Sequence, residues 1–239
     1  MTFNELVTSR RSVRVFDQEH DFDQDAVKRS LELAVLSPNS SNLQTWEFYR
    51  VRSGEMKGEF VPACMGQSAA RTASELVVFV ARRDKWKERT DWNFQNIRRQ
   101  SEGKLDSKSF KRAKQYYTQL IPFFYKQDFL GINTWIRKAV TLYRDLTGEP
   151  MMRQQTLADL RVVVNKSTAL AAQTFMLAMQ NEGYATCPME GFDKKIVKKL
   201  LNLPPAAEIT MIVACGKATP EGIYAPRTRV PMEEVVFSV

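Results

Sequence analysis

Histidine and cysteine are both scarce in this chain of 239 residues, which has one histidine and three cysteines. The histidine, His20, lies in the acidic stretch 19–23, whose composition is typical of an exposed turn. A metal site built from several histidines is therefore excluded, and a Ser-His-Asp triad could use only His20. Cys64, Cys187 and Cys215 lie far apart and form no Cys-x-x-Cys pair. We therefore expect neither a disulfide framework nor a thiolate zinc site, and no resident metal.

Long apolar runs are also absent. No stretch is long enough to span a bilayer, and the first residues lack the apolar run of a signal peptide. Separated cysteines fit a reducing compartment, so we expect a cytoplasmic protein without membrane contact. With 44% hydrophobic and 26% charged residues, the composition is that of an ordinary globular protein. One domain over residues 1–239 is the expectation.

Positive charge is in excess, with 35 lysines and arginines against 27 acidic residues and a net charge of +8. Such a balance can indicate nucleic acid, an anionic surface or an anionic ligand. Most of the cations are spread along the chain, as on solvated helix faces. Three arginines, however, gather around Ser12 (Arg10, Arg11 and Arg14), and Arg227 and Arg229 form a second cluster. Guanidinium forks bind phosphate well, so the two clusters would form an anion site if the fold brings them together.

Hydrophobic periodicity and turn residues predict an alternation of helices and strands. The capping box at Thr2 and Glu5 begins a helix that should run to about Arg10. Further helices are expected from Asp23 to before Pro38, over 159–180 and over 193–201, with two or three more in 84–150. Strands are expected over 46–51, 76–80, 184–187 and 209–215. The apolar tail 229–239 should be extended and needs a partner surface.

Four segments, in order, carry a family resemblance. The first is Arg10, Ser12, Arg14 and Phe16, matching Arg-x-Ser-x-(Arg/Lys) followed by Phe. The second is the run Pro38 to Phe48, and the third is Pro188, Glu190, Gly191, Phe192 and Asp193, matching Pro-x-Glu-Gly-Phe-Asp. The fourth is the basic pair Arg227 and Arg229. Together they resemble the nitroreductase-like family of FMN-dependent oxidoreductases, over roughly the first eighty and last seventy-five residues. Asn39 and Thr45 depart from the family's usual Ser and Pro.

The resemblance implies a fold and an assembly. The fold is α+β, a three-layer α/β/α sandwich around a mixed, largely antiparallel sheet. The assembly is an intertwined homodimer with two FMN sites at its interface. Residues 84–150 would form a helical insertion that covers the active site, with Phe123 and Phe124 governing substrate access.

The resemblance also implies site residues. Arg10, Ser12, Arg14, Arg227 and Arg229 would hold the FMN phosphate and the polar edge of the ring, while Arg11 either joins them or faces solvent. Pro38, Asn39, Ser40 and Asn42 belong to the loop that would reach the partner's flavin. Gln67 would contact the ring, and Arg71 could replace a family lysine. The backbone of Glu190 and Gly191, after Pro188 and Met189, would lie over the ring and donate to N5.

The implied activity is hydride transfer from NAD(P)H through flavin N5 to a nitroaromatic, quinone or similar acceptor by a ping-pong mechanism. The flavin would carry the chemistry, so no acid-base pair of side chains is required. A reductive dehalogenase or a flavin-degrading relative with the same fold is the alternative, and kinship of fold does not decide between them. A basic nucleic-acid-binding module is disfavoured, because no aromatic stacking platform accompanies the arginines.

Overall fold

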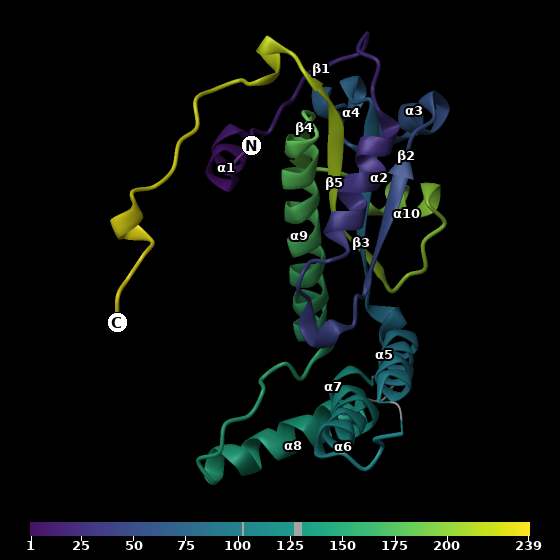
Figure 1. The fold of residues 1–239 in the computed structure, drawn as a ribbon, viewed down its shortest axis with the longest axis vertical. Coiled ribbons are helices and arrows are strands. Elements are labelled where there is room, and N and C mark those ends of the chain that lie inside the picture. Colours follow the sequence, from purple (N-terminus) through teal and green to yellow (C-terminus); the bar gives the residue numbers. More distant parts are fainter. Residues whose placement is uncertain (102, 127–130) are drawn as a thin grey trace.

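A single antiparallel sheet forms the middle layer of the protein (Figure 1). The computed structural model describes residues 1–101, 103–126 and 131–239. Its strands are β1 (Phe16–Asp17), β2 (Trp46–Val51), β3 (Glu75–Arg82), β4 (Ala185–Met189) and β5 (Ala207–Ala218). The order is β1-β5-β3-β2, with β4 also paired to β5. All these pairs are antiparallel, and one isolated parallel bridge joins Ser12 to Thr186.

Helices cover both faces of the sheet because alternate residues of β3 point into two separate cores. Val77 and Phe79 pack against α2 (Gln24–Ala34) and α9 (Leu157–Asn181). Leu76, Val78 and Val80 pack on the other face. That face is covered by α3 (Gly54–Ala63), α4 (Ser68–Thr72) and α10 (Lys194–Leu200). Every residue of β3 is buried, because helices cover both of its faces.

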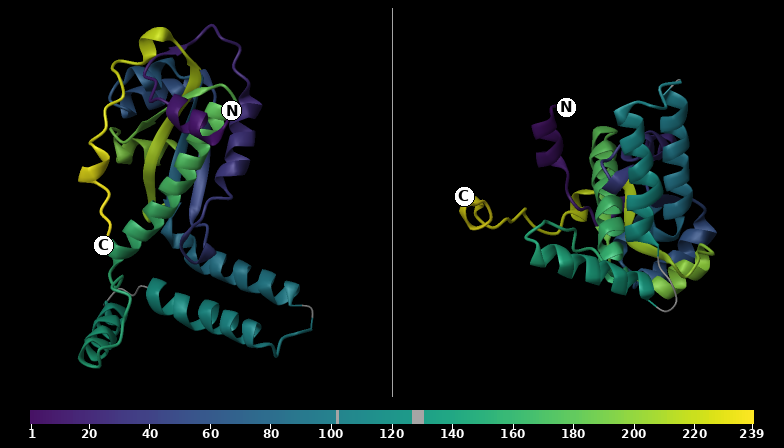
Figure 2. Two further views of the ribbon diagram at one scale, coloured as in Figure 1. Left: turned by 60° about the vertical axis from the view of Figure 1, so that its left-hand side comes forward. Right: turned by 90° about the horizontal axis from the view of Figure 1, so that it is seen from below.

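A group of helices lies below the sandwich in Figure 1 and comes from the middle of the chain. It contains α5 (Trp86–Gln100), α6 (Lys108–Gln115), a π-helical turn (Tyr116–Leu120), α7 (Ile121–Tyr125) and α8 (Ile132–Leu146). From α6 to α7 the chain is helical without a break, and this run lies beside α5 (Figure 2). The fully buried Arg137 of α8 donates to the carbonyls of Phe123 (2.9 Å) and Gln155 (2.9 Å). This guanidinium ties α8 to the end of α7 and to the segment before α9.

The N-terminal helix lies beside α9, whereas the C-terminal tail extends away from the sandwich (Figure 1). At the N-terminus, α1 (Phe3–Ser9) begins with the predicted capping box of Thr2 and Glu5. The C-terminal tail has only one short 3₁₀ turn, Met232–Glu234, and exposes Val235, Val236 and Phe237. Within the described residues, no helix combines the length and apolarity needed to cross a bilayer.

The fold prediction is confirmed as a three-layer α+β sandwich around a largely antiparallel sheet. The sequence analysis missed β1, α3 and α4, which are short or carry weak periodicity. His20 is half-buried rather than exposed, with its ring centroid 6.0 Å from that of Tyr184.

Candidate functional site

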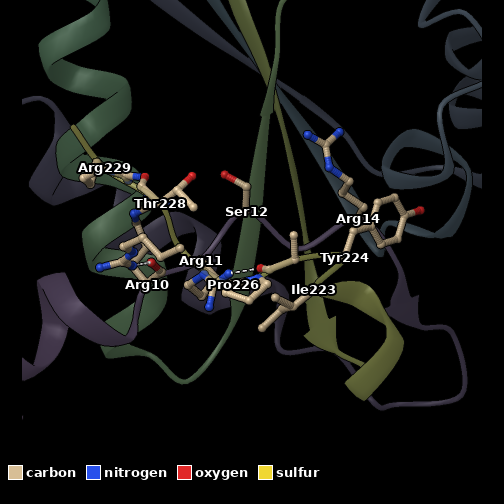
Figure 3. Close-up of a pocket in the computed structure, with 11 residues that line it drawn as sticks. Arg10, Arg11, Ser12, Arg14, Ile223, Tyr224, Pro226, Thr228 and Arg229 are labelled. Carbon is tan, nitrogen blue, oxygen red and sulfur yellow. Dashed lines mark hydrogen bonds between the residues drawn. The ribbon is translucent and has the colours of Figure 1, made fainter.

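The two arginine clusters meet in one pocket of about 500 Å³ (Figure 3). It is lined by Arg10, Arg11, Ser12, Arg14, Ile223, Tyr224, Ala225, Pro226, Arg227, Thr228 and Arg229. Ser12 lies between Arg10 and Arg229 on one side and Arg14 and Tyr224 on the other (Figure 3). The pocket therefore combines the first and last parts of the chain, as the sequence analysis required for a strong anion site.

Backbone contacts hold these two parts of the chain together. The N–H of Val13 donates to the carbonyl of Thr186 (3.0 Å), and the N–H of Arg14 donates to that of Gly222 (2.7 Å). A Cβ at Gly222 would lie 2.5 Å from the carbonyl oxygen of Val15 and 2.6 Å from Val13 Cγ1. Only glycine permits so close an approach. Gly222 therefore allows the C-terminal segment to pass over residues 13–15 and reach the pocket.

Two of the arginines fix the backbone of the pocket. Arg11 Nη2 donates to the carbonyl of Ala225 (2.5 Å), and Arg227 donates to the carbonyls of Arg10 and Val7. The guanidinium carbon of Arg14 lies 5.8 Å from the ring centroid of Tyr224, a cation–π distance. Arg11 thus anchors the C-terminal segment, which gives it a structural role that the sequence analysis left open.

The pocket carries positive charge that no lining residue neutralises. Five arginines line it, and no aspartate or glutamate does. Burial lowers the pKa of Arg10, and the neighbouring charges of Arg227, Arg229 and Arg11 lower it further. A lowered arginine pKa means that the surroundings disfavour the charged form. An anion in the pocket would relieve this repulsion, and a phosphate dianion suits guanidinium forks best.

The strand β4 connects this pocket to the Glu190–Gly191 loop. Thr186, at its start, bridges Ser12, and Glu190 follows its last residue. At the rise of an extended strand, these residues lie about 13 Å apart. Pro188 and Met189 lie within the strand, and Pro188 is half-buried while Met189 is buried. A ligand with a phosphate at one end and a polar ring at the other could lie along this edge.

Gln67, which was predicted to contact the ring, supports the Glu190–Gly191 loop. Its side-chain amide donates to the carbonyls of Gly191 (2.7 Å) and Cys64 (3.0 Å). A Cβ on Gly191 would lie 3.3 Å from the same nitrogen, so Gly191 admits Gln67 at close range. Arg71 donates to Ser68 (3.1 Å) on its own helix and does not line the arginine pocket.

The loop containing Pro38, Asn39, Ser40 and Asn42 lies elsewhere. Ser40 N–H donates to Ser167 Oγ (3.2 Å), in the middle of α9. From Ser167 to the end of α9 at Asn181 is roughly 21 Å at 1.5 Å per residue. The arginine pocket lies beyond that end, beside Thr186. Within one chain the structure therefore does not bring this loop to the arginines.

Backbone strain and side-chain bonds define this loop. Ser41, Asn42 and Gln44 have φ values of 57°, 51° and 48°, in the left-handed region that non-glycine residues rarely adopt. Ser41 Oγ lies 2.7 Å from Tyr116 Oη, and Asn93 Nδ2 donates to the carbonyl of Asn42 (2.6 Å). Residues of the middle helices thus hold the strained loop in place.

The two phenylalanines predicted for substrate access have different surroundings. Phe123 is half-buried and lines a groove of about 540 Å³ on the α6–α7 run. Phe124 is buried in the core of the middle helices and also borders a small enclosed hollow. Their rings pack edge to face with centroids 5.1 Å apart.

The sequence analysis missed several pocket residues, among them Ile223, Tyr224, Ala225, Pro226 and Thr228. They immediately precede Arg227 or separate it from Arg229, so the basic pair itself was the available signal. Within the described residues, no group of three or more His, Cys, Asp or Glu side chains could hold a metal ion.

Comparison with known proteins gives one consistent result. The sequence model of the nitroreductase family matches residues 7–217. "Putative NAD(P)H nitroreductase MhqN" of Bacillus subtilis (strain 168) is 25% identical over 236 residues, covering 98% of this chain and 97% of that protein. "Protein DrgA" of Synechocystis sp. (strain ATCC 27184 / PCC 6803 / Kazusa) is 25% identical over 227 residues, covering 95% and 89%.

Solved structures show the same fold. The putative nitroreductase ydfN of Bacillus subtilis has a TM-score of 0.76 at 22% identity, covering 99% of this chain and 98% of its own. A putative nitroreductase from Exiguobacterium sibiricum 255-15, solved in complex with FMN, has a TM-score of 0.69 at 21% identity, covering 100% and 98%.

Proposed function

The chain belongs to the nitroreductase family, and we propose that it is an FMN-dependent NAD(P)H oxidoreductase that reduces a nitroaromatic, quinone or similar acceptor. The arginine pocket carries this proposal, because five guanidiniums without a lining carboxylate need a strongly anionic ligand. A relative of the same fold was solved in complex with FMN, and other relatives are named NAD(P)H nitroreductases.

The residues present fit FMN. Arg10, Arg14, Arg227 and Arg229, with the Ser12 hydroxyl, would hold the phosphate and the polar edge of the ring. The Glu190–Gly191 loop, fixed by Gln67, would lie at the ring. When bound, FMN supplies hydride transfer at N5, from NAD(P)H and then to the acceptor. Each turnover would move two electrons and two protons in total: the hydride carries both electrons and one proton, and solvent supplies the second proton.

A second copy of the chain would complete the site. The loop over Pro38 to Asn42 lies too far from the arginines of its own chain to contact the same FMN. The C-terminal tail exposes Val235, Val236 and Phe237, an apolar segment that needs a covering surface. We propose a homodimer in which each C-terminal tail packs against the partner subunit and each loop reaches the partner's FMN. Three buried free cysteines fit a reducing, cytoplasmic location.

The visible spectrum of the purified protein tests the cofactor. A flavin spectrum, with FMN rather than FAD released on denaturation, is the expected result. A colourless protein that does not acquire the flavin spectrum on incubation with FMN would overturn the proposal, and salt-sensitive binding to DNA or RNA would then favour the nucleic-acid-binding alternative.

Turnover tests the reaction class. The protein, NADH or NADPH, and one acceptor at a time would be combined, using a nitroaromatic, a quinone and a halophenol. We expect the nitroaromatic and the quinone to be reduced. Productive reoxidation by the halophenol alone would instead identify a reductive dehalogenase.

Truncation before Arg227 tests the assembly. It removes two pocket arginines and the apolar tail, so we expect loss of both dimerisation and flavin retention. Light scattering after size-exclusion chromatography gives the mass, and absorbance gives the flavin content. A truncated dimer that stays yellow contradicts both assignments.

A further inference from the structure

A groove follows one face of the helical run from α6 to α7. Its volume is about 540 Å³, within the usual range of small-molecule sites. It is lined by Arg112, Gln115, Tyr116, Gln119, Leu120 and Phe123, which recur three or four positions apart and so share a face. Leu120 is 42% exposed there, although it is a large apolar residue. This face is available to a ligand.

The groove adjoins the strained loop. Tyr116 and Leu120 are the first and last residues of the π-helical turn, a rare feature that often marks functional sites. Both also line an enclosed hollow of about 70 Å³, together with Ser40 and Ser41. Tyr116 Oη contacts Ser41 Oγ at 2.7 Å. The groove therefore lies directly beside the loop that, in the proposed function, reaches the partner's FMN.

The groove has one charged lining residue, the cation Arg112, and the helix that carries it is basic. The helix α6 has four cations, Lys108, Lys111, Arg112 and Lys114, and no acidic residue. Residues 84–150 as a whole contain fourteen lysines and arginines against eight acidic residues. Among the described residues, no carboxylate pairs with Arg112, whereas Lys111 has Asp106 at 3.4 Å. A groove with aromatic walls and one unneutralised guanidinium suits an aromatic ligand that carries a phosphate group.

We propose that this groove binds the adenosine 2′-phosphate end of NADPH and thereby selects NADPH over NADH. The inference rests on the proposed function, which makes a reduced nicotinamide nucleotide the electron donor. Arg112 pairs with the 2′-phosphate, since a guanidinium fork matches a phosphate dianion. The rings of Tyr116 and Phe123 offer stacking surfaces to adenine. NADPH and NADH differ only in this phosphate, so a contact far from the nicotinamide can distinguish them.

Two measurements on wild type, Arg112→Gln and Arg99→Gln test the proposal. Arg99 is a matched control because it is an exposed arginine of the same helical region that does not line the groove. In turnover with one quinone, wild type and Arg99→Gln should favour NADPH over NADH by about tenfold in kcat/KM. In Arg112→Gln this ratio should fall to near one. Calorimetric titration should show the same pattern for 2′,5′-ADP against 5′-AMP, without any turnover.

The outcomes that overturn the inference differ from those that overturn the proposed function. Equal use of the two nucleotides by wild type, or a preference that survives in Arg112→Gln, overturns the inference while the oxidoreductase remains. A protein that reduces no acceptor overturns the proposed function, and the titration then decides alone. Binding of 2′,5′-ADP that depends on Arg112 supports the groove as the site of the 2′-phosphate, and binding that does not depend on Arg112 rejects that assignment. If Arg112 instead favours 4-nitrobenzoate over 4-nitrobenzamide without nucleotide preference, the groove is an anionic acceptor site and the inference is wrong.

Discussion

The arginine pocket and the α6–α7 groove are hollows of similar size, but five arginines line the first and one lines the second, and the chain builds them differently. The pocket joins segments more than two hundred residues apart, and several backbone hydrogen bonds fix it. The groove is one face of one helical run, and its single arginine is exposed. A preorganised pocket favours tight retention of a cofactor, whereas an exposed helix face favours exchange of a passing ligand. The arginine pocket is therefore suited to tight binding of one ligand, and the groove to discrimination between similar ligands that exchange.

The largest expected effect is the loss of FMN affinity when one arginine charge is removed from the arginine pocket, compared with the same change in the groove. Arg10→Gln removes a half-buried cation from the arginine pocket, and we expect FMN to bind about 10- to 100-fold more weakly, because charge-assisted hydrogen bonds contribute about 1.5–3 kcal/mol each. Arg112→Gln should leave FMN affinity within about twofold, since the two hollows share no lining residue. Fluorescence titration with FMN measures both. Equal losses of FMN affinity in the two variants would contradict the distinction between the pocket and the groove.

The comparison also explains what could be predicted from the sequence. The residues of the arginine pocket were predictable because Arg10, Ser12 and Arg14 match a family pattern and guanidiniums bind anions well, but only the fold shows that they meet Arg227 and Arg229. Gly222 was not, because its need to be glycine comes from the approach of Val13 and Val15, more than two hundred residues away. The strand over 76–80 was predictable because its continuous apolar run marks a buried strand, and the strand over 46–51 because it is rich in aromatic residues.

Of the residues that line the groove, only Phe123 was named from the sequence, as a residue that the family resemblance implies for substrate access. The structure buries Phe124 and puts Tyr116 beside Ser41. The groove's lining residues recur at ordinary helical spacing, but nothing in the sequence showed that this face of the helical run lies beside the loop at Ser41. Gln115 and Gln119 are ordinary helix-surface residues, so nothing in the sequence distinguished them.

Crowding at Gly222 offers the second test. In Gly222→Ala the new Cβ would meet the backbone of Val15 at 2.5 Å, so the C-terminal segment must shift. We expect a free energy of unfolding lower by about 1–3 kcal/mol and FMN binding about tenfold weaker. Gly54→Ala is the matched control because a Cβ there meets nothing within 4 Å. Chemical denaturation and FMN titration give both values, and a variant that binds FMN like wild type would show that the segment's position does not matter.

Alkaline pH should weaken the sandwich, which contains all three cysteines, while residues 84–150 contain none. Burial raises the pKa of Cys64 from 9.0 to about 11. Its contribution to stability is complete below pH 9 and is lost as pH rises to about 11, because only the unfolded thiol ionises in that window. At pH 10 this loss is on the order of 1 kcal/mol. Urea denaturation at pH 8 and pH 10 should show a smaller difference in the free energy of unfolding for Cys64→Ala than for wild type. Identical differences would mean that groups other than the Cys64 thiol cause the loss of stability at alkaline pH.

The smallest expected effect concerns the contact between the groove and the strained loop. Tyr116→Phe removes the hydroxyl that lies 2.7 Å from Ser41 Oγ, a hydrogen bond that contributes about 1 kcal/mol. Since Ser41, Asn42 and Gln44 hold left-handed backbone angles, the loop should open more often without it. We expect amide hydrogen exchange over residues 40–44 to be about fivefold faster, with no change over residues 10–14. Tyr143→Phe, on the exposed face of α8, is the control. Faster exchange at both places would mean that the arginine pocket and the groove do not open independently. Their independence is the premise on which FMN affinity is attributed to the pocket and nucleotide selectivity to the groove.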